Sequence, residues 1–470
     1  MSSFATGNVA RKNMKKCAAI ALALWLAEAS AQDAASEARW NAYGQATYIR
    51  DIHDAFPARY TNLNGSPNSL SPDKERSWSA TATAYLGAKP WRGGEVFFVP
   101  EMIAQVAFSE LHGLGGSVQN GELEKTGFSD PIFYRSRLFL RQTWNLGGES
   151  TRVESGPMQL AKALDSRRFV LTAGNLAIID IFDRNAFAGD IRQQFLSMNF
   201  ATYAAYDFAA DARGYSWGLA GEYYHDDWVL RAGRFLVPRL PNQLQLDHQF
   251  MKYYGDQVEL ERGHRWYARP GKVQVLAYRN VALMGRWNDA IDALRADPSK
   301  TAANCSETNY GSDNAAAPDL CYVRGRHVKV GIGASLEQSI TDDIGVNLRA
   351  MKSDGRSEVD AFESADSSLA LAALVKGTRW KRARDSVGIG LAQNWISPAN
   401  ANFLGMGGVD AFIGDGRIRN RPERAFELFY NLGVTKFFWL TLDYQRVENP
   451  AYNADRGPVN ICGFRLHAEF

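Results

Sequence analysis

Three arginines recur at short spacing in the segment 134–144, which reads YRSRLFLRQTW. Arg135, Arg137 and Arg141 fall on one face of an extended chain, because alternate residues of a β-strand point the same way. Planar guanidinium groups in such a row can bind the hydroxyl or anionic groups of a solute through paired hydrogen bonds. If the opposite face meets lipid, the arginines must face water, since each would cost roughly 2–4 kcal/mol near the bilayer midplane.

Acidic residues at matching spacing could oppose this basic row. Glu95 and Glu101 share one face of the segment EVFFVPE and are the first candidates, with Glu222, Glu259 and Glu261 behind them. A structural ladder of ion pairs and a solute-binding ladder would use the same residues, so both interpretations stay open. Mixed Arg and Glu side chains with interleaved aromatic rings suit polyols, whereas a pore for simple anions should lack the acidic set.

The segment 174–200 does not alternate cleanly and is too polar for a strand with an apolar face. We expect it to fold inward and narrow the space enclosed by the strands. An outside loop packed on its own aromatic residues is the competing interpretation. The charged and polar residues that would then border the constriction are Asp180, Asp183, Arg184, Asn185, Asp190 and Arg192.

The elements that position these residues come after an export signal. Four basic residues precede the apolar run CAAIALALWLA (17–27), and small residues follow at 29–31. This layout predicts a signal peptide over residues 1–31, cleaved before Gln32, because the apolar run is too short to span a bilayer as a helix. The remaining 439 residues carry 49 basic and 50 acidic side chains, so the sequence gives no support for nucleic-acid binding.

The rest of the chain, 32–470, reads as one all-β domain. It is rich in aromatic residues, with 12 Trp, 19 Tyr and 25 Phe in the whole sequence, and short alternating segments are separated by turns and longer loops. These features predict a transmembrane antiparallel β-barrel of about 16 strands, with 18 possible, in the outer membrane of a Gram-negative bacterium. Short turns should lie on the periplasmic side and long loops outside.

The last segment, VNICGFRLHAEF (459–470), shows the alternation most clearly. Phe464, Leu466 and Phe470 fall on one face, with Arg465 and His467 on the other. In a membrane barrel the first face meets lipid and the second meets a wet lumen. A strand that ends on an aromatic residue also resembles the segments that outer-membrane assembly machinery recognises, so Phe470 is expected to engage that machinery.

Three cysteines remain after residue 31. Cys305 and Cys321 flank a polar stretch, and in an oxidising periplasm they could close that loop, which would contribute roughly 3 kcal/mol. The seven histidines lie in no nucleophile-elbow or HExxH setting, and GxGxxG and P-loop motifs are missing. We therefore expect no enzyme activity, no metal site and no cofactor, although an enzyme or adhesin barrel that conducts little is a rival class.

Long, ordered segments of the chain resemble the carbohydrate-selective porins of the OprB type. The first strand of that family is similar to WNAYGQATYI (40–49). Its most distinctive blocks are similar to FYRSRLFLRQTWNLGGE (133–149), LTAGNLAIIDIFDRNAFAGDIRQQFLSMNF (171–200) and YAAYDFAADARGYSWGLAGEYYHDDWVLRAGRF (203–235). The likeness continues in YGDQVELE (254–261), PGKVQVLAYRN (270–280) and NPAYNADRGPVNICGFRLHAEF (449–470).

The resemblance implies a roughly 16-stranded barrel through which monosaccharides such as glucose diffuse passively into the periplasm. It also implies a pore narrowed by infolded loops and lined by charged residues, with no cofactor. Phe97 and Val99 depart from the polar residues expected in such a pore strand. The alternative is a general or anion-selective diffusion porin, and the sequence leaves monomer and trimer equally open.

Overall fold

Sixteen of the 18 described strands form one closed antiparallel barrel, in which β1 pairs with β18, while β5 and β6 pair with each other as a separate two-stranded sheet. The structure is a computed structural model that describes residues 39–306, 310–361 and 364–470, so the predicted signal peptide lies outside the described residues. The strands are β1 (Trp40–His53), β2 (Glu75–Ala88), β3 (Gly94–Val106), β4 (Ile132–Asn145), β5 (Ser150–Val153), β6 (Lys162–Asp165), β7 (Arg167–Leu176), β8 (Ser216–His225), β9 (Trp228–Phe235), β10 (Tyr254–Trp266), β11 (Arg269–Met284), β12 (Gly325–Ser339), β13 (Ile344–Ser353), β14 (Ser367–Lys376), β15 (Ser386–Trp395), β16 (Glu423–Thr435), β17 (Phe438–Glu448) and β18 (Val459–Glu469).

The described helices are short and lie between strands. The three α-helices are α2 (Met198–Ala201), α3 (Trp287–Ala296) and α4 (Pro398–Gly405). The 3-10 turns are η2 (Leu63–Gly65), η3 (Phe108–Leu111), η4 (Gly121–Lys125), η5 (Ile178–Asp180), η6 (Ala302–Asn304), η7 (Leu320–Tyr322), η8 (Gly377–Trp380) and η9 (Pro450–Tyr452). Within the described ranges, no helix has the length and apolar character needed to cross a membrane.

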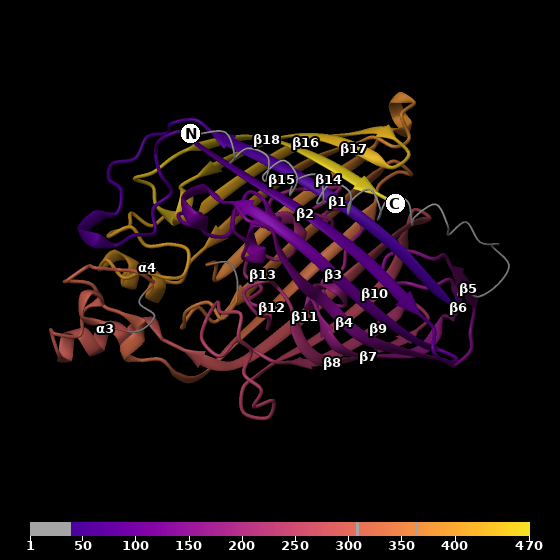
Figure 1. The fold of residues 1–470 in the computed structure, drawn as a ribbon, viewed down its shortest axis with the longest axis horizontal. Helices are drawn as coiled ribbons and strands as arrows, with labels where there is room; N and C mark the ends of the chain where they lie inside the picture. Colours follow the sequence, from indigo (N-terminus) through magenta and orange to yellow (C-terminus); the bar gives the residue numbers. More distant parts are fainter. Residues whose placement is uncertain (1–38, 307–309, 362–363) are drawn as a thin grey trace, which may run out of the picture.

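Connections of very different length alternate around the barrel. At one end, two residues join β8 to β9, β10 to β11 and β16 to β17. At the other end, long loops follow β3, β7, β11 and β15, and α3 and α4 project there, opposite the β5–β6 hairpin (Figure 1). This asymmetry assigns the short turns to the periplasm and the long loops to the outside. The predicted fold is confirmed, with 16 strands rather than 18 in the barrel.

Side chains of β18 alternate between the two faces as the sequence predicts. Arg465 and His467 point into the barrel and are buried, whereas Cys462 on the other face is exposed. The inward guanidinium of Arg465 donates hydrogen bonds to Thr441 of β17 and to two loop carbonyls. The outward rings of Phe464 and Tyr48 lie 6.0 Å apart across the β1–β18 closure. Apolar side chains therefore cover the outer wall while polar ones turn inward.

The outside loops pack on one another at the outer end of the barrel, and we call the described residues of the segments 285–324, 354–366 and 396–422 the loop cap. Trp287 of α3 and Phe403 of α4 are fully buried with ring centroids 5.0 Å apart, so the two helices share a core. Cys305 and Cys321 are joined by a disulfide within the first of these segments, where the sequence places them. The cap has a covalent tie, and its apolar core is continuous with the buried apolar residues inside the barrel.

The cap also buries Asp410, which should make its stability depend on pH. Its carboxylate accepts hydrogen bonds from the Ala411 N–H at 2.8 Å and the Ser364 hydroxyl at 2.9 Å, and burial raises its pKa to about 7. A carboxyl with a raised folded-state pKa binds its proton more tightly when folded. The stability it contributes is therefore full below a pH of about 4 and is lost as pH rises to 7.

We expect hydrogen exchange of residues 396–422, corrected for intrinsic rates, to quicken roughly tenfold between pH 6 and pH 7.5. Burial raises the pKa values of Asp319 and Asp415 only to about 6, but it also raises those of Asp360 and Asp366 in the cap, so a substitution is needed to identify the contribution of Asp410. Asp410→Asn keeps the size of the side chain and should flatten the profile. A variant whose exchange depends on pH as steeply as that of the unchanged protein would contradict this assignment.

Candidate pore-lining site

A β-bulge at Ser136 divides the predicted arginine row. Val99 of β3 pairs with Arg137, but the next residue, Pro100, pairs with Arg135, so Ser136 is an extra residue on β4. Pro100 has no N–H to donate to the ladder, which is why prolines in sheets favour bulges. The hydroxyl of Ser136 donates instead to the Val99 carbonyl at 2.9 Å. A bulge shifts the alternation by one residue, so the strand changes phase here.

The structure therefore places Arg135 on the outer face, which corrects the prediction that it lines the lumen. Its guanidinium lies over the ring of Trp217, 5.0 Å from the centroid, and Phe133 on the same outward face is 79% exposed. Tyr134 takes the inward position, and its hydroxyl donates to Glu101. The sequence signal for this change of phase is Pro100, in the middle of an otherwise regular strand.

Arg137 and Arg141 face the lumen as predicted. Arg137 donates two hydrogen bonds to the carboxylate of Asp180, at 2.6 and 2.8 Å. Arg141 donates to the Met158 carbonyl at 2.9 Å and lies over the rings of Phe97 and Phe139. Arg137 thus anchors a loop, and Arg141 sits on an aromatic platform.

The opposing glutamates face inward, but their partners are not the arginines of β4. Glu95 binds the amine of Lys162, from the β5–β6 hairpin, and accepts the Leu160 N–H at 3.1 Å. Glu101 forms ion pairs with Lys125 and Arg192, each at 2.9 Å. Both carboxylates are almost fully buried, so paired donors replace the water they lose. The sequence predicts correctly that Glu95 and Glu101 face inward, but it does not predict the loop residues that pair with them.

The segment 177–210, which follows β7, runs through the interior of the barrel, as the sequence predicts for 174–200, and residues 211–215 return to the wall beside β4. We call the segment 177–210 the constriction loop. Inward-facing glutamates of the wall accept its backbone N–H groups. Glu259 of β10 accepts from Asp183 at 2.7 Å, and Glu337 of β12 accepts from Ala186 at 2.7 Å. Glu427 of β16 accepts from residues 196 and 197 at 2.6 and 3.1 Å.

Cations of the wall hold the carbonyl groups of the same loop. Arg465 of β18 donates to the carbonyls of Ile191 and Gln194, at 2.8 and 2.9 Å. Arg349 of β13 donates to the Phe200 carbonyl at 3.1 Å, and Lys272 of β11 donates to a further carbonyl at 2.6 Å. A loop inside a barrel has no strand neighbour, and buried backbone polar groups need partners. The charged side chains of the wall supply those partners.

The six residues predicted at the constriction have different roles. Asp180 receives Arg137, and Asp183 is buried and accepts the Thr202 hydroxyl at 2.8 Å. Asn185 and Asp190 use their side chains to accept N–H groups of their own turns. Arg184 and Asp190 are exposed, whereas Arg192 is engaged by Glu101 and Glu122.

A second loop, 107–131, also folds inward, and its inward course is not among the features predicted from the sequence. Gly113 and Gly115 allow its close approach: a Cβ on Gly115 would lie 2.4 Å from the Tyr452 ring, and Gly113 has a φ of +79°. Glycines at such positions remove a steric clash and permit the left-handed backbone. The glycine-rich stretch GLGGSVQNG is the signal that could have indicated this packing.

The two inward loops meet at a buried group of four charges. Arg192 of the constriction loop binds Glu122 at 2.7 Å and Glu101 at 2.9 Å, and Lys125 binds Glu122 at 3.2 Å and Glu101 at 2.9 Å. Burial disfavours the charged form of Glu122, but Arg192 and Lys125 outweigh it and lower its pKa. Two cations and two anions therefore lock both loops to β3.

A second buried group joins three strands with one arginine. Arg231 of β9 contacts Glu222 of β8 at 3.1 Å, and it contacts Glu259 and Glu261 of β10 at 2.6 and 2.9 Å. The sequence names these three glutamates as possible partners of the β4 arginines, whereas the structure pairs them with Arg231. Most charges of this wall therefore compensate one another locally.

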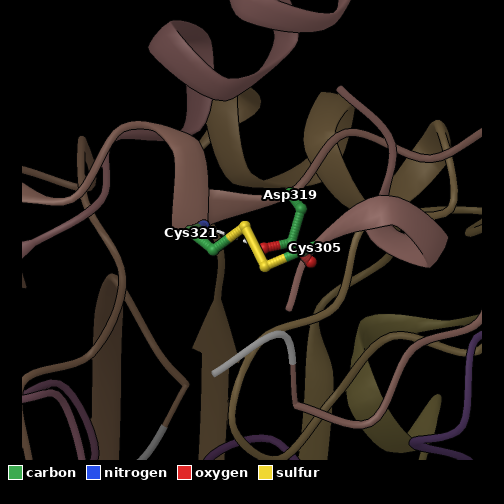
Figure 2. Close-up of side chains that lie close together, drawn as sticks. All are labelled: Cys305, Asp319 and Cys321. Carbon is green, nitrogen blue, oxygen red and sulfur yellow. Dashed lines mark hydrogen bonds between the residues drawn. A yellow bond between two sulfur atoms is a disulfide. The ribbon is translucent and has the colours of Figure 1, made fainter. Parts of the chain in front are cut away.

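One group of side chains lies close enough to suggest a metal site, but its chemistry argues against one. Cys305, Asp319 and Cys321 lie together in the loop cap (Figure 2). The two sulfurs are bonded to each other, which removes the thiolates that a metal would need. The Asp319 carboxylate accepts the Cys321 N–H at 2.8 Å. These three residues form a turn that is closed by the disulfide and stabilised by the hydrogen bond to Asp319.

Comparisons with known proteins agree with this architecture. Residues 81–470 match the model of the "Carbohydrate-selective porin, OprB family". The structure of Pseudomonas putida OprB at high pH superposes with a TM-score of 0.63 at 12% identity, covering 93% of this chain and 100% of that one. The DcaP channel of Acinetobacter baumannii gives a TM-score of 0.49 at 7% identity, covering 92% and 97%. No curated protein sequence matches the chain.

The match to the family model spans most of the sequence, and the likeness to the Pseudomonas putida protein independently supports the same barrel. The inward wall of paired charges and the infolded loop fit a channel. The chain therefore belongs to the OprB family of carbohydrate-selective porins and is an integral outer-membrane channel rather than an enzyme.

Proposed function

We propose that the channel passes glucose-like monosaccharides by passive diffusion, through a weak and saturable contact with the lumen wall. The observation that carries this proposal is a row of inward arginines seated on aromatic rings. Arg168 of β7 lies 3.5 Å from the centroid of Tyr224, and Arg141 lies 5.2 Å from that of Phe139. Guanidinium edges can donate to sugar hydroxyls, while aromatic faces cover the apolar C–H face of a pyranose.

Charge compensation around this row favours a neutral solute. Arg137 is neutralised by Asp180, and Arg192 and Lys125 together are neutralised by Glu101 and Glu122. Arg231 contacts three glutamates, one of which also contacts Lys272. A wall whose charges are paired keeps its hydrogen-bonding groups but sets up a weak net field. A sugar hydroxyl can exchange into such a pair at little electrostatic cost, because it both donates and accepts.

One observation favours anion passage as a second candidate. In the part of the chain that the structure describes, neither Arg141 nor Arg168 has a carboxylate within ion-pair distance; each donates to a backbone carbonyl instead. Reversal potentials in asymmetric KCl separate the candidates. A strong preference for chloride would favour the anion porin, and a value near zero would favour the sugar channel.

Liposome swelling should show faster entry of glucose than of tetraethylene glycol, an uncharged molecule of similar mass. Arg168→Gln removes the cation above Tyr224 and should reduce the glucose rate several-fold with little effect on the glycol. Arg424→Gln, on an outward position of β16, is the matched control and should behave as the unchanged protein. Equal rates for the two solutes in the unchanged channel would refute sugar selectivity.

The two arginines on either side of the bulge provide a paired test of the lumen. Arg137→Ala removes the anchor of Asp180 and should raise single-channel conductance or alter ion selectivity, because the constriction loop gains freedom. Arg135→Ala, two residues away on the outer face, should leave conductance within experimental error. Identical conductance changes in both variants would contradict the assigned faces of β4.

We also propose that residues 1–31 are removed on export. The basic residues, the short apolar run and the small residues at 29–31 support this cleavage. Amino-terminal sequencing of protein extracted from outer membranes should begin at Gln32. A sequence that begins upstream of the apolar run would refute the cleavage.

A further inference from the structure

The outer wall carries a notch at the level where the bulge turns Arg135 outward. β4 pairs with β7 only from Leu138 onward, because β7 ends at Leu176 and the chain turns inward. The first residues of β4 therefore have a strand neighbour on one side only, in β3. A cavity of about 310 Å³ occupies this place, closed by the segments 211–215 and 244–248.

Two guanidinium groups line this cavity, and among the described residues neither forms an ion pair, although the carboxylate of Asp211 attracts Arg213 from farther away. Arg135 is exposed and makes no hydrogen bond or ion pair with the described residues, only its contact with Trp217. Arg213 lies over the ring of Tyr134, 4.7 Å from the centroid, and its buried Nε has no hydrogen-bond partner. Asp211 also lines the cavity, but its Oδ1 accepts two N–H groups of its own turn. A buried N–H without an acceptor is costly, which points to a ligand that supplies one.

The surroundings of the notch identify the kind of molecule that meets it. Apolar side chains on the outward face flank it: Trp217, Leu219, Phe133 and Leu244 are between 37% and 79% exposed. The notch lies at the end of the wall that carries the long loops, hence in the outer half of the membrane. A ligand there would place acyl chains on the apolar wall and an anionic headgroup against the arginines.

We propose that this notch binds a phosphate group of the glycolipid that forms the outer leaflet of the outer membrane. Arg135 and Arg213 donate to the phosphate oxygens, and Trp217 packs against the adjoining sugar and acyl chain. Charge-assisted hydrogen bonds from guanidinium to phosphate are short and strong, and the lipid-facing setting weakens competition from water. The proposal does not depend on which solute passes through the lumen.

The chain provides a matched control on the same side of the barrel. Arg262 of β10 lies over Trp228, 5.0 Å from the centroid, which is the same distance as Arg135 over Trp217. This second pair lies near the short turn that joins β8 to β9, at the periplasmic end of the wall. The two pairs share their chemistry, but only Arg135 lines the cavity and shares it with a second guanidinium group, so the comparison also holds in detergent.

The test measures binding of purified bisphosphorylated lipid A to the detergent-solubilised protein by native mass spectrometry. Arg135→Gln and Arg213→Gln should each weaken binding about five-fold, and Arg262→Gln should not change it. Lipid A without phosphates should bind the unchanged protein as weakly as the double variant binds bisphosphorylated lipid A. Millimolar inorganic phosphate should not displace the lipid, because it lacks the apolar contacts.

Three results would overturn the proposal: full binding by the double variant, an equal loss in Arg262→Gln, or complete displacement by inorganic phosphate, which would indicate a site for free anions. The mobility of unheated protein on denaturing gels reports whether each variant keeps its barrel. Arg213 is partly buried and its replacement could disturb folding. Arg135 is exposed, so Arg135→Gln alone decides the question if the second variant does not fold.

Discussion

The structure depends on hydrogen-bond partners for the backbone N–H and carbonyl groups of a loop that runs inside the barrel. The strands pair with each other around the closed barrel, but the constriction loop has no strand beside it, and its buried N–H and carbonyl groups need partners. Glu259, Glu337 and Glu427 accept its N–H groups, while Arg465 and Arg349 donate to its carbonyls. Charged residues on the lumen face therefore act first as substitutes for a neighbouring strand, and the position of the loop follows from where they stand.

This use of charge shapes the electrostatics of the channel. Some carboxylates that hold a loop N–H have a cation beside them, and Arg231 contacts Glu259 in this way while also binding Glu222 and Glu261. Removing one member of such a group would leave an uncompensated buried charge, which costs about 3–5 kcal/mol. The ion pairs of the wall therefore stabilise one another. The side chains that remain available to a solute are arginines that lie over aromatic rings and have no carboxylate partner among the described residues, such as Arg168.

Alternation and composition were enough to predict the barrel, the inward face of Arg137 and Arg141, and the inward course of the segment after β7. Each of these predictions depends on a local sequence pattern. The free-energy cost of a charge in lipid then identifies the lumen-facing side of a strand. The partners of Glu95 and Glu101 were not predictable, because Lys162 and Arg192 reach them from segments 67 and 91 residues away. The second inward loop, 107–131, was missed because glycines and small polar residues leave no periodic signal.

Arg135 shows how one local feature can override a pattern that is correct on both sides of it. Pro100 cannot donate to the ladder, Ser136 is inserted opposite it, and the residues before the bulge change faces. A change of phase would be expensive deep in the lipid, but an outward arginine three residues after the first residue of β4 reaches the polar boundary of the membrane. The bulge thus gives one short segment two surfaces: Arg137 holds a loop inside the pore, and Arg135 meets the lipid headgroups outside. Sequence periodicity assigns both arginines to one face because it assumes an unbroken strand, and the proline is the residue that breaks it.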